Sequence, residues 1–133
     1  MNTHKNYFKE KLKGIQCMIW DLEFKRYKTF YVREQIRKEY DAIRSRLEIV
    51  KTQIASEKDK PTMPEGDVKR LEDDEIRMNR DIERKLAQMK DLDAEIHGSK
   101  PTAELPEGHQ GLNDTLEALR ELIQVTKKYI KEI

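Results

Sequence analysis

Two histidines, one glutamate and the single cysteine carry the side chains that could bind a metal ion or act as a nucleophile. His97 and His109 stand in a turn-forming segment, where Glu107 could supply a third metal ligand. A metal site needs three or four ligands that point at one ion, and the positions of these residues in the sequence are only weak evidence that they do so. Cys17 has Lys13 one helical turn before it, as an activated thiol needs, but no histidine at helical spacing. We therefore expect no metal, no cofactor and no catalytic residue.

Acidic residues gather in two places that could form a carboxylate centre. They are Glu72, Asp73, Asp74 and Glu75, followed by Asp91, Asp93 and Glu95. Di-iron helical bundles combine such carboxylates with a Glu-x-x-His pair, which this sequence lacks. Both clusters are therefore interpreted as solvated helix faces. The chain is expected not to be an enzyme and to have no small-molecule substrate.

A basic segment interleaved with aromatic residues is the candidate nucleic-acid-binding region. Its cations could neutralise phosphates while its aromatic rings stack on bases. Three glutamates, Glu23, Glu34 and Glu39, interrupt or border the segment and weaken this interpretation. The candidate nucleic-acid-binding residues are Lys25, Arg26, Lys28, Arg33, Arg37 and Lys38.

The elements that position these side chains are predicted to be helices, because apolar residues recur at alternating intervals of four and three. This spacing is the a/d pattern of a heptad, which places an apolar seam on one side of a helix. The pattern runs through Phe8, Leu12, Ile15, Ile19 and Leu22, and again through Ile36, Tyr40, Ile43, Leu47, Val50 and Ile54. We call this line of residues the seam. It predicts one long helix over about residues 3–58.

A second line of large side chains follows the same spacing on a neighbouring face of this helix. Trp20, Phe24, Tyr27 and Tyr31 are separated by four, three and four residues. They lie about 100° around the helix from the seam, since each residue turns the helix by that angle. A helix that is apolar on both faces needs two neighbours or a partner from another chain.

Two proline-containing connections divide the rest of the chain. Pro61 and Pro64 end the first helix, and Gly98 with Pro101 ends a second helix predicted over about 63–97. A third helix is predicted over about 106–133, starting at either Pro106 or Asn113. The fold class is therefore all-α: an elongated antiparallel three-helix bundle or coiled coil, running up, down and up, with a very long first helix.

Composition and charge fit one domain of long helices. Charged residues make up 40% of the 133 residues and the net charge is only +1. The charge is uneven, since residues 1–58 carry fourteen basic and eight acidic residues. No apolar run is long enough to span a membrane, and the N-terminus lacks the apolar core of a signal peptide. These features predict a cytoplasmic protein.

The predicted helix lengths leave the start of the chain without cover. A second helix of about 50 Å can run back along the first only to about residue 25, so residues 1–25 would form a projecting arm unless a bend at Gly14 folds them onto the end of the bundle. Its apolar residues would then be exposed, as at an interface. We therefore expect a non-enzymatic structural or adaptor subunit that binds itself or a larger protein complex. The expected protein-interface residues are Phe8, Leu12, Ile15, Ile19, Trp20, Phe24, Tyr27 and Tyr31.

Overall fold

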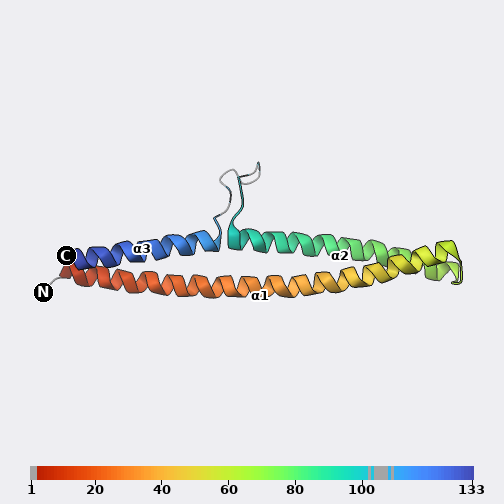
Figure 1. Ribbon diagram of the computed structural model, residues 1–133, viewed down its shortest axis with the longest axis horizontal. Helices are drawn as coiled ribbons and strands as arrows, with labels where there is room; N and C mark the ends of the chain where they lie inside the picture. The colour runs from red at the N-terminus through yellow and green to blue at the C-terminus, as the bar shows by residue number, and fades with distance from the viewer. Residues whose placement is uncertain (1–2, 102, 104–107, 109) are drawn as a thin grey trace. The chain divides into compact units, whose positions relative to one another are not determined.

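The computed structural model describes residues 3–101, 103, 108 and 110–133, and these residues form three α-helices and no strand. Helix α1 spans Thr3–Asp59, α2 spans Glu65–His97 and α3 spans Leu112–Glu132 (Figure 1). The prediction of an all-α chain of three helices with a very long first helix is confirmed. The earlier of the two predicted starts of the third helix, Pro106, lies outside the described residues.

Helix α1 is continuous over 57 residues. Gly14 does not interrupt it, and neither does the segment around Thr29, where branched and aromatic side chains favour helix poorly. Thr29 is 7% exposed and its hydroxyl donates a hydrogen bond of 2.9 Å to the carbonyl oxygen of Lys25. This bond satisfies a polar side chain that the seam would otherwise bury without a partner.

The chain divides into two compact units. Unit 1 contains residues 1–31 and 92–133, and unit 2 contains residues 32–91. Both α1 and α2 therefore contribute to each unit, whereas α3 lies wholly in unit 1.

In unit 2 the second half of α1 pairs with most of α2. The seam residues Leu47, Val50 and Ile54 are buried, as is Met89 of α2. The Glu57 carboxylate closes the turn between the helices by accepting hydrogen bonds from the backbone N–H groups of Thr62 and Met63, at 2.8 and 2.9 Å. Further along, Lys85 of α2 pairs with Glu39 of α1, which makes this pairing antiparallel.

In unit 1 the first half of α1 packs against α3. Ile19 of the seam is 3% exposed and forms a cluster with Leu116 and Ile123 of α3. Leu12, Ile15, Leu22 and Leu119 pack around this cluster. The pairing is antiparallel, because Arg26 bonds to Asn113 near the start of α3 whereas Phe8 lies against Tyr129 near its end.

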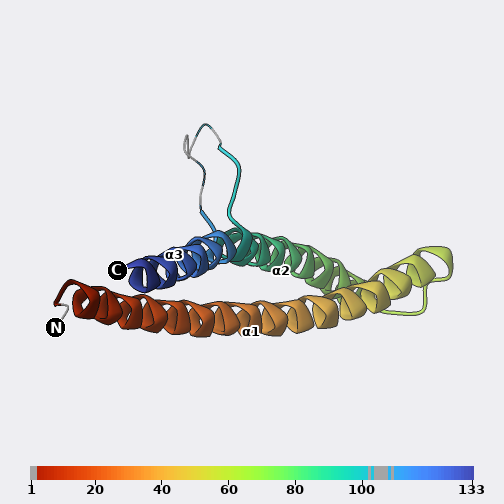
Figure 2. The same cartoon turned by 60° about the vertical axis from the view of Figure 1, so that its left-hand side comes forward.

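The expected up-down-up path is therefore wrong, and so is the expectation that the start of α1 has no cover from its own chain. Within unit 1, α3 runs antiparallel to α1 and reaches Phe8 (Figures 1 and 2). The physical reason is apolar burial. A third helix that returned beside α2 would leave the seam of residues 8–22 in water, at a cost of about 1.5–3 kcal/mol for each large side chain.

The second connection makes this path possible, because the end of α2 and the start of α3 contact the same short segment of α1. Phe30 lies against the ring of His97, and Arg26, four positions earlier on α1, bonds to Asn113. The Asn113 amide in turn lies 3.2 Å from Nδ1 of His97. Gly111 is buried against the end of α2, where a Cβ would lie 2.5 Å from the carbonyl oxygen of Ile96. A gap in the apolar seam of α1, which includes Arg26 and Thr29, coincides with this junction.

Candidate functional site

The candidate site is the aromatic stripe, which we define as Trp20, Phe24, Tyr27 and Tyr31 of α1. These side chains are 61%, 63%, 66% and 58% exposed, respectively. Their spacing places them in one line on a single rigid helix. Four large rings on one helix face are therefore available to a partner.

The stripe is exposed because it lies on a different side of α1 from the seam. Trp20 is one residue after Ile19, so the two side chains point about 100° apart. Ile19 contacts α3 and is 3% exposed, whereas Trp20 is 61% exposed. Every later member of the stripe keeps this offset, because four and three residues both approximate one helical turn. Packing in unit 1 thus leaves the stripe uncovered.

Charged side chains accompany the stripe along one edge. The ammonium group of Lys28 lies 5.6 Å from the centre of the Phe24 ring, within the range of a cation–π interaction. Asp21 stands one heptad before Lys28 on the same edge. On the opposite edge, Glu23 accepts a 2.7 Å hydrogen bond from Arg120 of α3. One edge is thus held by α3, and the Asp21–Lys28 edge is left for other contacts.

The eight residues expected at a protein interface separate into two groups. Trp20, Phe24, Tyr27 and Tyr31 come together as the stripe. The other four, Phe8, Leu12, Ile15 and Ile19, lie on the seam and pack against α3 instead. The Phe8 ring, for example, lies 4.9 Å from the Tyr129 ring. These four residues therefore build the fold of unit 1.

The six residues of the candidate nucleic-acid-binding segment do not form a free basic patch. Lys25 lies 3.5 Å from Glu95, and Arg26 donates a 3.0 Å hydrogen bond to Asn113. Glu34 accepts hydrogen bonds from Arg37 at 3.0 Å and lies 3.7 Å from Arg33. Lys28 lies over Phe24, and Lys38 is exposed. Neighbouring carboxylates therefore offset much of the charge that phosphate groups would meet.

Of the residues considered for metal binding or nucleophilic chemistry, the structure describes His97 and Cys17. His97 contacts Asn113 and Phe30, while His109 and Glu107 lie outside the described residues. Within the described part of the chain, no three His, Cys, Asp or Glu residues are placed to hold a metal ion. Cys17 is exposed on α1.

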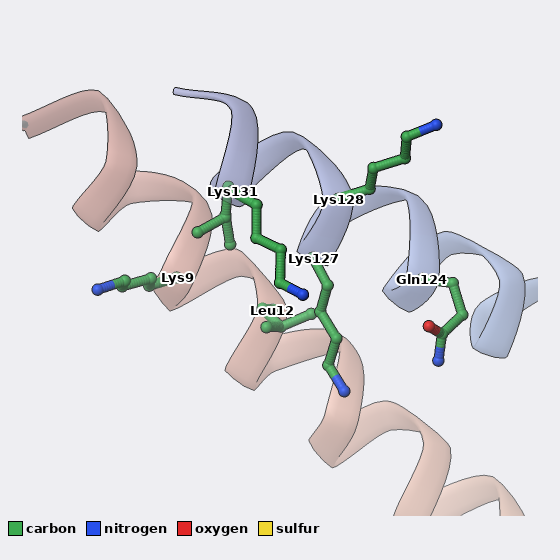
Figure 3. Close-up of a pocket in the computed structure, with 7 residues that line it drawn as sticks. Lys9, Leu12, Gln124, Lys127, Lys128 and Lys131 are labelled. Carbon is green, nitrogen blue, oxygen red and sulfur yellow. The ribbon is translucent and has the colours of Figure 1, made fainter.

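A basic hollow between α1 and the end of α3 was not expected from the sequence. Its volume is about 450 Å³, and Leu12 contributes to its lining (Figure 3). The other labelled residues around it are Lys9, Gln124, Lys127, Lys128 and Lys131. Three of these lysines lie in the last two turns of α3, where the helix dipole favours positive charge. The lysine side chains border the hollow, whereas its lining surface is mostly apolar.

A smaller apolar patch on α3 was also missed. Val125 is 65% exposed and Leu122 is 45% exposed. Their spacing of three residues was a detectable signal, but it was hidden beside the stronger core pattern of Leu116, Leu119 and Ile123. With two aliphatic side chains instead of four rings, this patch offers much less area than the stripe.

No protein-family model, curated protein or solved structure matches the chain. Within the described residues, no helix has a segment both long and apolar enough to cross a lipid bilayer.

Proposed function

We propose that this protein is a non-enzymatic structural or adaptor subunit that binds another protein chain through the aromatic stripe. The observation that carries the proposal is the exposure of four large rings in one line on a continuous helix. Aromatic side chains supply much of the energy of protein interfaces, because each can bury a large rigid area. Burying one such side chain is worth about 1.5–3 kcal/mol.

The position of the stripe supports an interface with another chain over a role in folding. The seam beside it already holds unit 1 together through Ile19, Leu116 and Ile123. Scattered exposed apolar residues are normal on protein surfaces, but a continuous row of rings is characteristic of a binding site. The stripe also lies on a helix, so it is presented in a fixed geometry and loses little conformational entropy on binding.

The basic segment gives less support to a nucleic-acid-binding function. Lys25, Arg33 and Arg37 are each close to a carboxylate, and Tyr27 and Tyr31 belong to a row with Trp20. Binding to phosphates would weaken steeply with added salt because counterions are released. Apolar association through the stripe would change little with salt, so a salt series separates the two functions.

Photo-crosslinking in cells that make the protein tests the proposed function. A photoreactive phenylalanine analogue replaces Phe24, and a matched variant carries it at Ile49, which is 60% exposed on α1 in unit 2. We expect a discrete protein adduct of higher mass from position 24 and none from position 49. Equal labelling from both positions, or no adduct from position 24, would contradict an interface at the stripe.

A further inference from the structure

We propose that the partner at the aromatic stripe is a second copy of this chain, bound with its α1 antiparallel to the first. This proposal rests on the proposed function and names its partner. The spacing of Trp20, Phe24, Tyr27 and Tyr31 is four, three and four, so it reads the same in both directions. A two-fold symmetric interface needs such self-complementarity, because each copy offers the same surface to the other.

The spacing also sets the register of the pairing. A two-fold axis that passes between the two helices, level with the peptide bond from Lys25 to Arg26, places Trp20 opposite Tyr31 of the second copy, and Phe24 opposite Tyr27 of the second copy. Each ring of one helix then meets a ring of the other, and the four layers repeat the a/d packing of an antiparallel coiled coil. The large indole is paired with a smaller ring in both outer layers, which evens out the volume along the interface.

The charges on the free edge fit this orientation. In antiparallel packing, equivalent edges of the two helices face each other, so Asp21 meets Lys28 of the second copy and Lys28 meets its Asp21. No ion pair within the described residues engages Asp21 or Lys28. The two-fold axis would therefore create two equivalent opposite-charge contacts at the rim.

A parallel pairing fits less well. It would direct Lys28 toward Glu23 of the second copy, but Glu23 is already bonded to Arg120 at 2.7 Å. It would also place the two Trp20 indoles in one layer. The two helix dipoles would lie side by side and point in the same direction, which is unfavourable. The antiparallel arrangement avoids all three costs.

The size of the stripe predicts a reversible dimer. Eight rings that are each about 60% exposed would together bury roughly 1,000 Å², since an aromatic side chain buries about 150–250 Å² when fully covered. This area is near the lower limit for a specific protein interface. We therefore expect the wild-type chain to exchange between monomer and dimer as its concentration changes.

Sedimentation equilibrium of the purified full chain tests whether a second copy binds at the stripe. The wild-type chain should approach twice its monomer mass as concentration rises. Phe24→Asp should weaken dimerisation at least about tenfold, as expected for a residue at the centre of an interface. Val125→Asp is the matched control, because Val125 is 65% exposed in the same unit but lies on α3. Circular dichroism should show unchanged helix content in both variants.

Charge reversal tests the register. Asp21→Lys and Lys28→Asp should each weaken dimerisation several-fold by placing like charges opposite each other, and the double variant should restore it. In a parallel dimer Asp21 would face Gln16, so reversing Asp21 alone would have little effect. Restoration by the double variant supports the antiparallel register, and additive loss in the double variant would overturn it.

The single cysteine reports orientation directly. Spin labels on Cys17 of the two copies would be offset by roughly 25 Å along the helix axis in the antiparallel register, because Cys17 then lies opposite position 34. In a parallel dimer they would be about 10 Å apart, across the interface alone. A single short distance would overturn the proposed orientation.

The outcomes separate this proposal from the proposed function. A monomeric wild-type chain at every concentration overturns the second copy as the partner, and an adduct from position 24 with a different protein would then leave the proposed function standing. A dimer that Phe24→Asp leaves intact and Val125→Asp disrupts places the contact on α3 and overturns the proposal. A concentration-dependent dimer lost only in Phe24→Asp supports it.

Discussion

The two halves of α1, residues 3–31 in unit 1 and residues 32–59 in unit 2, share one seam but present different outward faces. Ile19 in the first half and Leu47 in the second are 3% and 5% exposed, and each packs within its own unit. Outward, the first half exposes the four rings of the aromatic stripe. The second half exposes Val32 and Ile49, which are too far apart to form a row. The seam therefore contributes to the core of both units. The outward face differs: in the first half of α1 it carries a row of rings, and in the second half it does not.

The two connections between helices also differ, in their length and in the interactions that close them. The turn of unit 2 is short and is closed by a carboxylate, since Glu57 accepts hydrogen bonds from Thr62 and Met63. The connection in unit 1 is longer and is closed by packing, since Gly111 lies directly against the backbone of residues 96–98. The connection of unit 2 therefore depends on hydrogen bonds to a carboxylate, whereas that of unit 1 depends on close packing of the backbone at a glycine.

The largest expected effect comes from creating a cavity in either seam. Leu116→Ala in unit 1 should lower the free energy of unfolding by about 2–5 kcal/mol, because Leu116 is 0% exposed. Leu47→Ala, with Leu47 at 5% exposure, is the matched variant in unit 2. Hydrogen exchange should rise mainly in residues 3–31 and 112–132 for the first variant, and in residues 32–91 for the second. An identical exchange pattern in both would show that the units open together.

Gly111→Ala should have the next largest effect, through steric overlap at the connection of unit 1. The added Cβ would lie 2.5 Å from the Ile96 carbonyl oxygen and closer still to the backbone of His97 and Gly98. Overpacking of this kind costs about 1–3 kcal/mol. The control is Gly14→Ala in α1, where a Cβ meets nothing within 4 Å and should stabilise the helix by about 1 kcal/mol. Chemical denaturation measures both, and equal stability of the two variants would refute the close packing at Gly111.

The helices themselves could be predicted from the sequence because their signals are local. The four-and-three spacing identified α1, and the prolines and glycines bounded the connections. The path of α3 could not be predicted in this way, because it depends on which apolar seams cover each other across the fold. The necessary clue was energetic: Phe8, Leu12 and Ile19 would have remained exposed in the expected arrangement, and α3 was the segment able to cover them.

The candidate site was predicted in part for the same reason. Trp20, Phe24, Tyr27 and Tyr31 could be placed in one line by helical spacing alone. Spacing could not reveal that Lys25 would meet Glu95 or that Arg26 would meet Asn113, since these partners lie about 70 or more residues away in the chain. Periodicity therefore locates a surface, whereas only tertiary structure shows which of its charged side chains already have a partner.

Acid should weaken the connection of unit 2 more than that of unit 1. Hydrogen bonds from the Thr62 side chain, from the Thr62 backbone and from the Met63 backbone lower the pKa of Glu57 below its ordinary value of 4.5. A lowered pKa means that the stabilisation is fully present above pH 4.5 and is lost as the pH falls through the folded-state value. The stability difference between wild type and Glu57→Gln should therefore shrink with acidification. A difference that stays constant from neutral to acidic pH would exclude this role of the carboxylate.

The smallest expected effect on stability comes from the stripe itself, which sharpens the contrast between the two faces of α1. Trp20→Ala should change the unfolding free energy of the monomer by no more than about 0.5 kcal/mol, because Trp20 is 61% exposed and lies outside the core of unit 1. The measurement is denaturation at a concentration low enough to keep the chain monomeric. The same substitution should reduce self-association strongly, whereas Ile49→Ala in unit 2 should leave both quantities unchanged. If Trp20→Ala instead destabilised the monomer as much as Leu116→Ala does, the stripe would belong to the core, and its rings would be needed for folding and not for binding.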